Sequence, residues 1–264
     1  NISLLRARGV TIVEPESGRL ASGASGDGRL ASRTAIVAAI RGALATSGPL
    51  ARLRVVVSAG GTHEAIDPVR FIGNRSSGQM GVAIAEAAFD AGAAVTSVLG
   101  PTVTVPPSVG DSVRVESARE MAEAVEAACQ EADVLIMAAA VADFRPESTA
   151  TSKIKKGPGT DAPVIALTRN PDILASVDVP GLVKIGFAAE TDDLLANAAD
   201  KLRRKGLTMI VANDAVATIG SGDSQATLLY REGEPEPLPA MPKSDLARVI
   251  VDRVARLRRE AADA

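Results

Sequence analysis

Short apolar runs alternate with helical segments along the chain from about Leu53 onward. Strands are expected at 55–58, 94–99, 113–115, 134–138, 184–187 and 209–211. Helices are expected at 78–91, 118–132, 192–205 and 244–259. Strands that alternate with helices build a mainly parallel sheet with helices on both faces. The sequence therefore predicts a doubly wound, Rossmann-like α/β fold.

Three local signals refine this pattern. Gly92 follows the first of these helices, where glycine is a natural C-terminal cap. The apolar run 227–230, which Gly233 punctuates, predicts an edge strand. Ser244 is expected to be the N-cap of the last helix, because its hydroxyl can accept a hydrogen bond from a free backbone N–H group.

Residues 1–52 differ from the rest of the chain. A short strand is expected at 10–13 and a helix at 34–46. Residues 17–30 between them are rich in glycine and serine and too polar to form a core of their own. Because Ser47-Gly48-Pro49 then breaks the chain, we expect a tail or linker over 1–52 and a domain over 53–264.

The composition excludes several classes of function. A net charge of -3 and an aromatic content of 2% argue against a nucleic-acid binder that stacks bases on aromatic rings. The single cysteine, Cys129, excludes an internal disulfide and a cysteine zinc cluster, and it fits a reducing cytosol. Since no apolar run is long enough to span a bilayer and no secretory signal is seen, we expect a cytoplasmic protein without a membrane partner.

The segment 58–81 is the strongest candidate for a phosphate site. The apolar run 55–57 leads into Gly60-Gly61, and a helical pattern begins after Ser76-Ser77-Gly78. Glycines let a phosphate approach the backbone, and a helix N-terminus carries partial positive charge. Taken alone, the glycine pair is a weak signal, because many strand-to-helix turns contain glycine.

Known nucleotide motifs can be tested against this segment. The Lys-Ser or Lys-Thr pair of a P-loop is absent at the expected helix start. The second strand leads into Gly100-Pro101 rather than ending in the acidic residue of a dinucleotide-binding fold, and Tyr230 does not begin a Tyr-x-x-x-Lys motif. NAD chemistry is therefore disfavoured. The loop instead contains Arg70, Asn74 and Arg75, whose side chains can bind further oxyanions.

A second candidate segment follows the central strand. Ala138, Ala139 and Ala140 would let a ring or sugar lie against the backbone at the carboxyl end of that strand, where ligands bind in open α/β sheets. Asp143 could accept hydrogen bonds from ribose hydroxyls or hold a cation. The residues leave an alternative open, in which a helix packs tightly over the strand and Asp143 is its cap.

Three later segments have both a functional and an ordinary interpretation. Lys153 begins a basic loop and could neutralise charge during phosphoryl or nucleotidyl transfer, although such clusters are usually solvated surface. The run 170–173 could be merely a turn that caps the next helix. Lys201 and Lys205 are four residues apart on one helix face, which by itself indicates a solvated face.

Taken in order, these segments strongly resemble the phosphopantothenate-cysteine ligase family of coenzyme A biosynthesis. The matching positions are 58–81, 138–145, 153–156, 170–173, 186–191, 201, 205 and 211–214. The resemblance covers roughly residue 53 to the C-terminus, and the ordered set is far more specific than any single motif. In bacteria such a ligase is commonly fused behind a flavin-dependent decarboxylase. Residues 18–30 look like the last motif of that partner, with Ala21-Ser22-Gly23 where a cysteine is usual, so we expect neither decarboxylase activity nor a flavin.

The resemblance implies a two-step reaction. The carboxylate of 4'-phosphopantothenate attacks the α-phosphate of CTP, giving an acyl-cytidylate and pyrophosphate. The amine of free L-cysteine then attacks the acyl carbon and expels CMP. Mg²⁺ is implied because the triphosphate needs charge neutralisation. The family also implies a homodimer and, in the intact protein, the fused decarboxylase domain.

The resemblance also implies roles for individual residues. Lys153 would stabilise charge in the first step, Asn74 would position the acyl intermediate, and Arg70 would bind pantothenate phosphate or carboxylate across a dimer interface. Ala140 would be a further substrate contact, and Asp143 would meet the ribose or a metal-bridged group. The implied nucleotide contacts are Gly60, Gly61, Met137, Ala138, Ala139, Asp143, Lys153, Asn170, Pro171, Asp172, Ile173, Phe187, Lys201 and Lys205.

Two other classes of function stay open. One is an NAD(P)-dependent reductase, which the missing acidic residue and the missing Tyr-x-x-x-Lys motif oppose. The other is a non-catalytic nucleotide-binding module on the same fold. The preference for cytosine over adenine is implied by bacterial members of the family and not by these residues.

Overall fold

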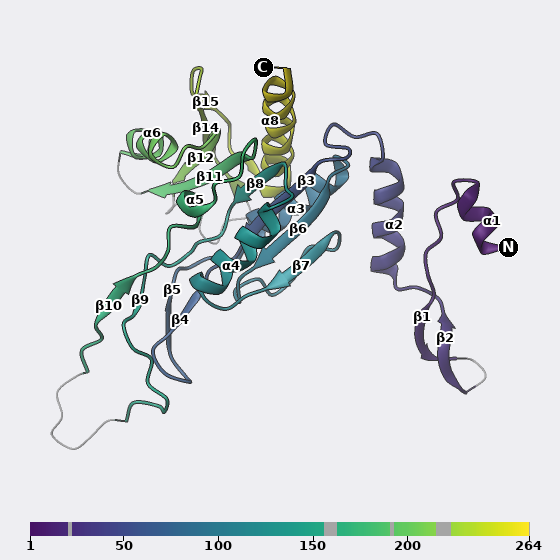
Figure 1. The fold of residues 1–264 in the computed structure, drawn as a ribbon, viewed down its shortest axis with the longest axis horizontal. Coiled ribbons are helices and arrows are strands. Elements are labelled where there is room, and N and C mark those ends of the chain that lie inside the picture. Colours follow the sequence, from purple (N-terminus) through teal and green to yellow (C-terminus); the bar gives the residue numbers. More distant parts are fainter. Residues whose placement is uncertain (21–22, 156–162, 191–192, 215–222, 264) are drawn as a thin grey trace.

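The computed structural model describes residues 1–20, 23–155, 163–190, 193–214 and 223–263. An eight-stranded sheet with helices on both faces forms its centre (Figure 1). Its strands are β3 (Arg54–Ala59), β6 (Ala94–Leu99), β7 (Asp111–Arg114), β8 (Val134–Met137), β11 (Val183–Glu190), β12 (Met209–Asp214), β14 (Ala226–Tyr230) and β15 (Glu236–Pro237). The prediction of an α/β fold with a mainly parallel sheet is confirmed.

The spatial order of the sheet is β15-β14-β12-β11-β8-β3-β6-β7. The strands from β7 to β12 are parallel, whereas β14 and β15 are antiparallel to their neighbours. The chain therefore enters this sheet in its middle, at β3, and adds strands outward to β7. It then returns to the middle at β8 and adds strands toward the other edge. The direction of winding reverses between β3 and β8, and ligands bind at the carboxyl ends of strands beside such a point.

Alternate residues of the central strands face different helices. Val55 and Val57 of β3 belong to the cluster under α3 (Gln79–Asp90) and α8 (Lys243–Asp263). Val56 belongs to the cluster under α4 (Ala118–Cys129), α5 (Ile173–Ser176) and α6 (Leu194–Arg204). Side chains alternate along a strand, so a strand buried on both faces reads as a continuous apolar run. This is why the apolar runs in the sequence located the strands.

Three local predictions differ from the structure, and one is confirmed. Residues 10–13 are not a strand, because the local pairing partners are β1 (Glu16–Arg19) and β2 (Ser25–Arg29). The strand at 227–230 is not at the edge, since β15 pairs outside it. The last helix begins at Lys243, so Ser244 lies in its first turn rather than at the N-cap. Gly92 has φ +96° after α3, as a C-terminal glycine should.

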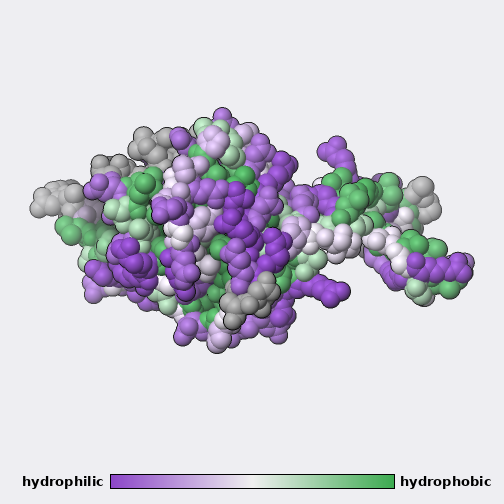
Figure 2. All heavy atoms as spheres, turned by 90° about the horizontal axis from the view of Figure 1, so that it is seen from above, coloured by the Kyte–Doolittle hydropathy of each residue, from purple (hydrophilic) through white to green (hydrophobic). Residues whose placement is uncertain are grey.

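The N-terminal part projects from the sheet domain (Figure 1). It consists of α1 (Ile2–Ala7), the β1–β2 hairpin and α2 (Arg33–Ala45), and it exposes apolar side chains such as Leu4, Ile40 and Leu44 (Figure 2). Arg41 of α2 donates to Asp90 of α3 at 2.7 Å. Leu50 is buried in the core next to Ala88 and Ala91. The division of the chain at residue 52 stays a prediction.

Two antiparallel hairpin arms leave the sheet beside the reversal point (Figure 1). One arm is β4 (His63–Ala65) with β5 (Phe71–Gly73), and the other is β9 (Phe144–Pro146) with β10 (Leu167–Arg169). A minor pair, β13 (Asp223–Ser224) and β16 (Met241–Pro242), precedes α8. Among the described helices, none has the length and apolar content needed to cross a membrane.

Candidate functional site

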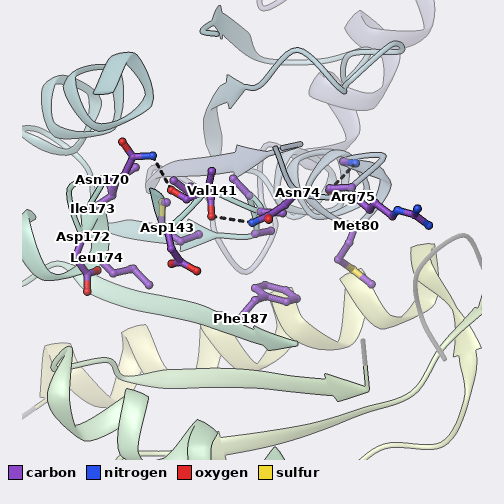
Figure 3. Close-up of a pocket in the computed structure, with 18 of the residues that line it drawn as sticks. Asn74, Arg75, Met80, Val141, Asp143, Asn170, Asp172, Ile173, Leu174 and Phe187 are labelled. Carbon is purple, nitrogen blue, oxygen red and sulfur yellow. Dashed lines mark hydrogen bonds between the residues drawn. The ribbon is translucent and has the colours of Figure 1, made fainter. Parts of the chain in front are cut away.

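A large pocket of about 1030 Å³ opens at the carboxyl ends of β8, β11 and β12 and at the start of α3. Its wall contains most of the residues that the sequence singled out (Figure 3). These are Asn74, Met137, Ala138, Ala139, Ala140, Asp143, Asn170, Pro171, Asp172, Ile173, Phe187, Lys201 and Lys205. Gly60, Gly61, Arg70 and Lys153 do not line it. Segments separated by more than a hundred residues therefore meet where the topology predicts a ligand.

The start of α3 forms one wall of the pocket. Gly78 is the N-cap in a left-handed conformation with φ +70°, and no side chain caps the helix. Gln79, Met80 and Gly81 of the first turn line the pocket. The first N–H groups of a helix have no partner within the helix and carry partial positive charge, so this wall favours an anion. The predicted glycine-led helix start is present, and the β4–β5 arm lies between it and the end of β3.

Gly60 and Gly61 have a different local role from the expected phosphate cradle. The N–H group of Gly61 donates to Thr102 Oγ1 at 2.7 Å, and the carbonyl of Gly60 accepts from Ala140 N at 2.8 Å. A Cβ on Gly61 would lie 2.9 Å from the carbonyl oxygen of Asn74. The two glycines thus permit close packing behind the pocket wall, and their assignment as direct nucleotide contacts stays a prediction.

Two buried hydroxyls hold the alanine turn after β8. Ser58 Oγ accepts from Ala139 N at 3.1 Å, and Thr62 Oγ1 accepts from Ala142 N at 3.0 Å. Both hydroxyl residues are fully buried. The turn is therefore fixed by side chains of β3 and the loop after it, which leaves its small side chains in the pocket wall.

Asp143 is exposed at the end of this turn and lines the pocket. It does not cap a helix, because β9 begins at the next residue. The part of the alternative in which Asp143 caps a helix is therefore wrong, whereas helices do pack over this strand. The backbone carbonyl of Asp143 accepts from Asn170 N at 2.9 Å, which joins the turn to the other arm strand.

Two asparagines connect the loops around the pocket through their amide groups (Figure 3). Asn74 Nδ2 donates to the carbonyl of Val141 at 3.0 Å, and Asn170 Nδ2 donates to the carbonyl of Ala142 at 2.8 Å. Asn170 Oδ1 accepts from Arg145 at 3.1 Å. The Asn170 amide is thus used on both sides for loop structure.

Lys201 and Lys205, at the C-terminal end of α6, face the pocket and not the solvent. Lys201 Nζ donates to the carbonyl of Phe187 at 2.7 Å. Lys205 Nζ lies 2.9 Å from Asp172 Oδ1, and the Lys205 side chain is only 16% exposed. Asp172 is also the N-cap of α5, where it accepts from Ala175 N. The prediction that 170–173 caps a helix is confirmed, and the solvated-face interpretation of the two lysines is wrong.

Arg70 and Lys153 lie together on the arms, away from the wall of this pocket. Arg70 forms an ion pair with Asp67 at 2.5 Å and donates to the carbonyl of Ile154 at 3.2 Å. Lys153 is exposed. The Arg70 side chain, followed by nearby backbone N–H groups, holds the pKa of the Asp67 carboxyl well below its ordinary value. Residues 156–159 of the basic loop lie outside the described residues.

Sequence reasoning gave no site role to several polar residues in the pocket wall, among them Lys243 and Asn213. Lys243 reaches the pocket from the first turn of α8, and its Nζ lies 3.5 Å from Gln79 Oε1. Asn213 lines the pocket at the end of β12, and its Oδ1 is buried without a hydrogen-bond partner among the described residues. The run 211–214 contained a signal for Asn213, since it follows a buried strand. Nothing in the local sequence distinguishes Lys243 from other helix-start lysines.

Comparison with known proteins gives a consistent result. The family described as "DNA/pantothenate metabolism flavoprotein C-terminal domain" matches residues 50–257. The Coenzyme A biosynthesis bifunctional protein CoaBC of Mycobacterium tuberculosis is 43% identical over 96% of this chain and 65% of its own length. A protein named Cysteine/Cysteine sulfinic acid decarboxylase, from an unknown prokaryotic organism, is 42% identical over 97% of this chain and 74% of its own length. This chain thus spans about two thirds of the length of its CoaBC relatives.

Solved structures agree with the sequence relatives. The crystal structure of the C-terminal domain of CoaBC superposes with a TM-score of 0.70 at 40% identity and covers 81% of this chain and 100% of that chain. A mutant of Cab2 in complex with phosphopantothenate-cysteine shares the fold, with a TM-score of 0.66 at 16% identity over 80% of this chain and 89% of that chain. The chain therefore belongs to the family of DNA/pantothenate metabolism flavoprotein C-terminal domains.

Proposed function

We propose that this chain is a CTP-dependent ligase that joins 4'-phosphopantothenate to L-cysteine in coenzyme A biosynthesis. The observation that carries this proposal is the convergence of the alanine turn, the 170–173 loop, Phe187 and the α6 lysines on one pocket at the reversal point of the sheet. The names of the CoaBC relatives support the pathway. The nucleotide, the intermediate and the metal are parts of the proposal.

The chemistry follows from the two ends of the pocket. At one end, Lys201 and Lys205 offer ammonium groups beside the carbonyl of Phe187 and the carboxylate of Asp172, a mixed donor and acceptor surface suited to the nucleotide. At the other end, the free N–H groups of α3 favour the negative charge of phosphate groups. A nucleoside triphosphate laid across the pocket would meet both surfaces.

The proposed reaction has two steps. The carboxylate of 4'-phosphopantothenate attacks the α-phosphorus of CTP, so an acyl-phosphate bond forms and pyrophosphate leaves. The amine of cysteine then attacks the acyl carbon, the amide bond forms, and CMP leaves with the former carboxylate oxygen. In this proposal Asn74 holds the acyl intermediate between these steps, and the contact of its amide with the turn at Val141 in the pocket wall supports that role.

Mg²⁺ would be held chiefly by the substrate. Mg²⁺ usually binds proteins through one or two carboxylates together with substrate phosphates and water. The exposed carboxylate of Asp143 in the pocket wall fits that donor set. No cluster of three or more metal-ligating side chains occurs among the residues that the structure describes, which also fits an ion that arrives with the triphosphate. When bound, the ion would neutralise charge on the phosphates.

A second copy of the chain would complete the site. Arg70 and Lys153 are implied in the reaction by the family resemblance, yet both lie on the arms outside the pocket wall. The arms expose apolar side chains, including Phe71, Phe144 and Leu167, which a partner surface would cover. A homodimer in which the arms contact the partner molecule is therefore part of the proposal.

The proposal is tested by incubating the chain with 4'-phosphopantothenate, cysteine, Mg²⁺ and each nucleoside triphosphate in turn. We expect pyrophosphate release with CTP and phosphopantothenate, and CMP release only after cysteine is added. Absence of pyrophosphate release with every triphosphate would overturn the proposal. Loss of NADPH absorbance or release of carbon dioxide from cysteine would instead support a reductase or a decarboxylase.

A further inference from the structure

A buried carboxylate connects Arg70 to the residue that follows Lys153. Asp67 lies in the turn between β4 and β5 and is 2% exposed. Its Oδ2 accepts from Arg70 Nε at 3.0 Å and from the Arg70 terminal nitrogen at 2.5 Å. The same oxygen accepts from Ile154 N at 3.2 Å, across eighty-seven positions of sequence. Ile154 directly follows Lys153.

The other oxygen of Asp67 shapes its own turn. Asp67 Oδ1 accepts from the backbone N–H groups of Val69 and Arg70, each at 2.9 Å. A buried carboxylate is costly unless hydrogen bonds and a countercharge satisfy it. Here every contact that satisfies it comes either from its own turn or from the segment after Lys153. Asp67 thereby couples the local turn to the basic segment.

The segment that contains Lys153 is attached to the β4–β5 arm at several points. Ile154 donates its N–H group to Asp67 and accepts at its carbonyl from Arg70 at 3.2 Å. Upstream, Thr149 Oγ1 donates to the carbonyl of Ala65 at 3.1 Å, and Ala150 N donates to the carbonyl of Ile66 at 3.0 Å. The backbone around Lys153 is thus fixed, while its side chain is exposed and available to a phosphate.

We propose that Asp67 is a positioning residue for nucleotidyl transfer. Asp67 holds the backbone of the Lys153 segment in a fixed place relative to Arg70. This inference rests on the proposed ligase function and on the charge-stabilising role of Lys153 within it. Asp67 itself touches no substrate. It acts by presenting the Lys153 ammonium group and the Arg70 guanidinium group as one unit on the arm.

The test is a double-mutant cycle on the full chain. Asp67→Asn keeps the size of the side chain but removes its negative charge. One carboxylate oxygen is replaced by an NH₂ group, which donates hydrogen bonds and cannot accept them. With saturating phosphopantothenate, we expect kcat for pyrophosphate release to fall by about tenfold to a hundredfold, the scale of a displaced catalytic group, while KM for CTP changes little. In a Lys153→Gln background, Asp67→Asn should slow the reaction further by no more than about twofold. Independent, multiplicative losses would overturn the inference.

Glu64→Gln is the matched control. Glu64 is another buried carboxylate of the same arm, but its Oε1 accepts from Ala118 N and does not touch the Lys153 segment. This variant should keep the kcat of the wild-type chain. An equal fall in kcat for both variants would show that any damage to the arm suffices, and would overturn a specific role for Asp67.

A measurement without substrate keeps the inference separate from the proposed function. Hydrogen exchange on the wild-type chain should show a protected Ile154 amide, and Asp67→Asn should make that amide exchange at least about tenfold faster. An unprotected Ile154 amide in the wild type would overturn the inference even if the ligase assay succeeds. If the wild type releases no pyrophosphate, the proposed function fails and with it the catalytic meaning of the contact.

Discussion

The ammonium group of Lys205 lies 2.9 Å from the carboxylate of Asp172, and this ion pair joins α6 to the N-cap of α5 at the pocket. The same Asp172 oxygen also accepts from Ala175 N at 3.4 Å. One carboxylate thus caps the start of a helix and neutralises a pocket lysine at the same time. Two segments that look like ordinary turn and surface in the sequence therefore form one polar surface.

Lys205→Gln should weaken CTP binding. The change leaves Asp172 without its countercharge in the pocket wall where the nucleotide is proposed to bind. We expect KM for CTP to rise by about tenfold, the effect of one charge-assisted hydrogen bond. Arg204→Gln is the control, because that side chain is 70% exposed and its ion pair among the described residues is a long one, with Asp200 at 3.9 Å. The same KM in the Lys205 variant as in the control would contradict the assigned contact.

Asn74→Asp should separate the two half-reactions. Asn74 Nδ2 donates to the carbonyl of Val141, and a carboxylate at this position can only accept. We expect pyrophosphate release to continue while amide formation slows by about tenfold, because the acyl intermediate would lose a donor. Single-turnover measurement of pyrophosphate and then CMP follows each step. Asn74→Ala removes the donor without adding charge, and an equal loss in both steps of Asn74→Asp would argue against this role.

Glu236→Gln should destabilise the fold in a pH-dependent way. Glu236 accepts from the Tyr230 hydroxyl at 2.5 Å and from Arg253 at 2.5 Å. The Arg253 side chain is the main reason that the pKa of Glu236 is lowered from 4.5 to about 2. We expect a loss of about 1 to 3 kcal/mol in the free energy of unfolding at neutral pH, as for hydrogen bonds to charged groups.

The sign of the pH effect follows from the lowered pKa of Glu236. A carboxyl with a lowered pKa stabilises the folded state above the pKa of the unfolded chain and loses that contribution as pH falls. The difference between wild type and Glu236→Gln should therefore be full above about pH 4.5 and shrink toward pH 2. Urea unfolding over this range measures it. Glu234→Gln, at an exposed position two residues away, should show no such difference.

Gly81→Ala should destabilise the start of α3. A Cβ at this position would lie 2.5 Å from the Ala59 Cβ and 2.9 Å from the carbonyl oxygen of Ser58. Because both atoms belong to the buried strand β3, α3 would have to move away from it, at a cost of about 1 to 3 kcal/mol in the free energy of unfolding. Gly26→Ala is the control, since no atom lies within 4 Å of its added Cβ. Equal thermal midpoints for the two variants would show that α3 does not approach the strand this closely.

The sheet could be predicted because its strands carry their own signal. Every residue of β8 is buried, so its continuous apolar run identifies it as a strand without any knowledge of the neighbouring strands. The sequence could not show that the strand at 227–230 lies inside the sheet. The strand β15 that pairs with it on the outer side has only two residues and almost no sequence signal. Residues 10–13 have an apolar pattern but lack a strand to pair with.

The sequence by itself determined the alternation of strands and helices, the alanine turn, the helix cap at Asp172 and the family. Three features were decided only by the tertiary structure. Lys205 contacts Asp172 instead of water, and Lys243 reaches the pocket from the last helix. Asp67 binds both Arg70 and the backbone of Ile154. The physical reason is the sequence separation over which each interaction acts. Apolar periodicity and capping act between residues a few positions apart, whereas the partner of a charged side chain is chosen by which distant segments the packed sheet brings together.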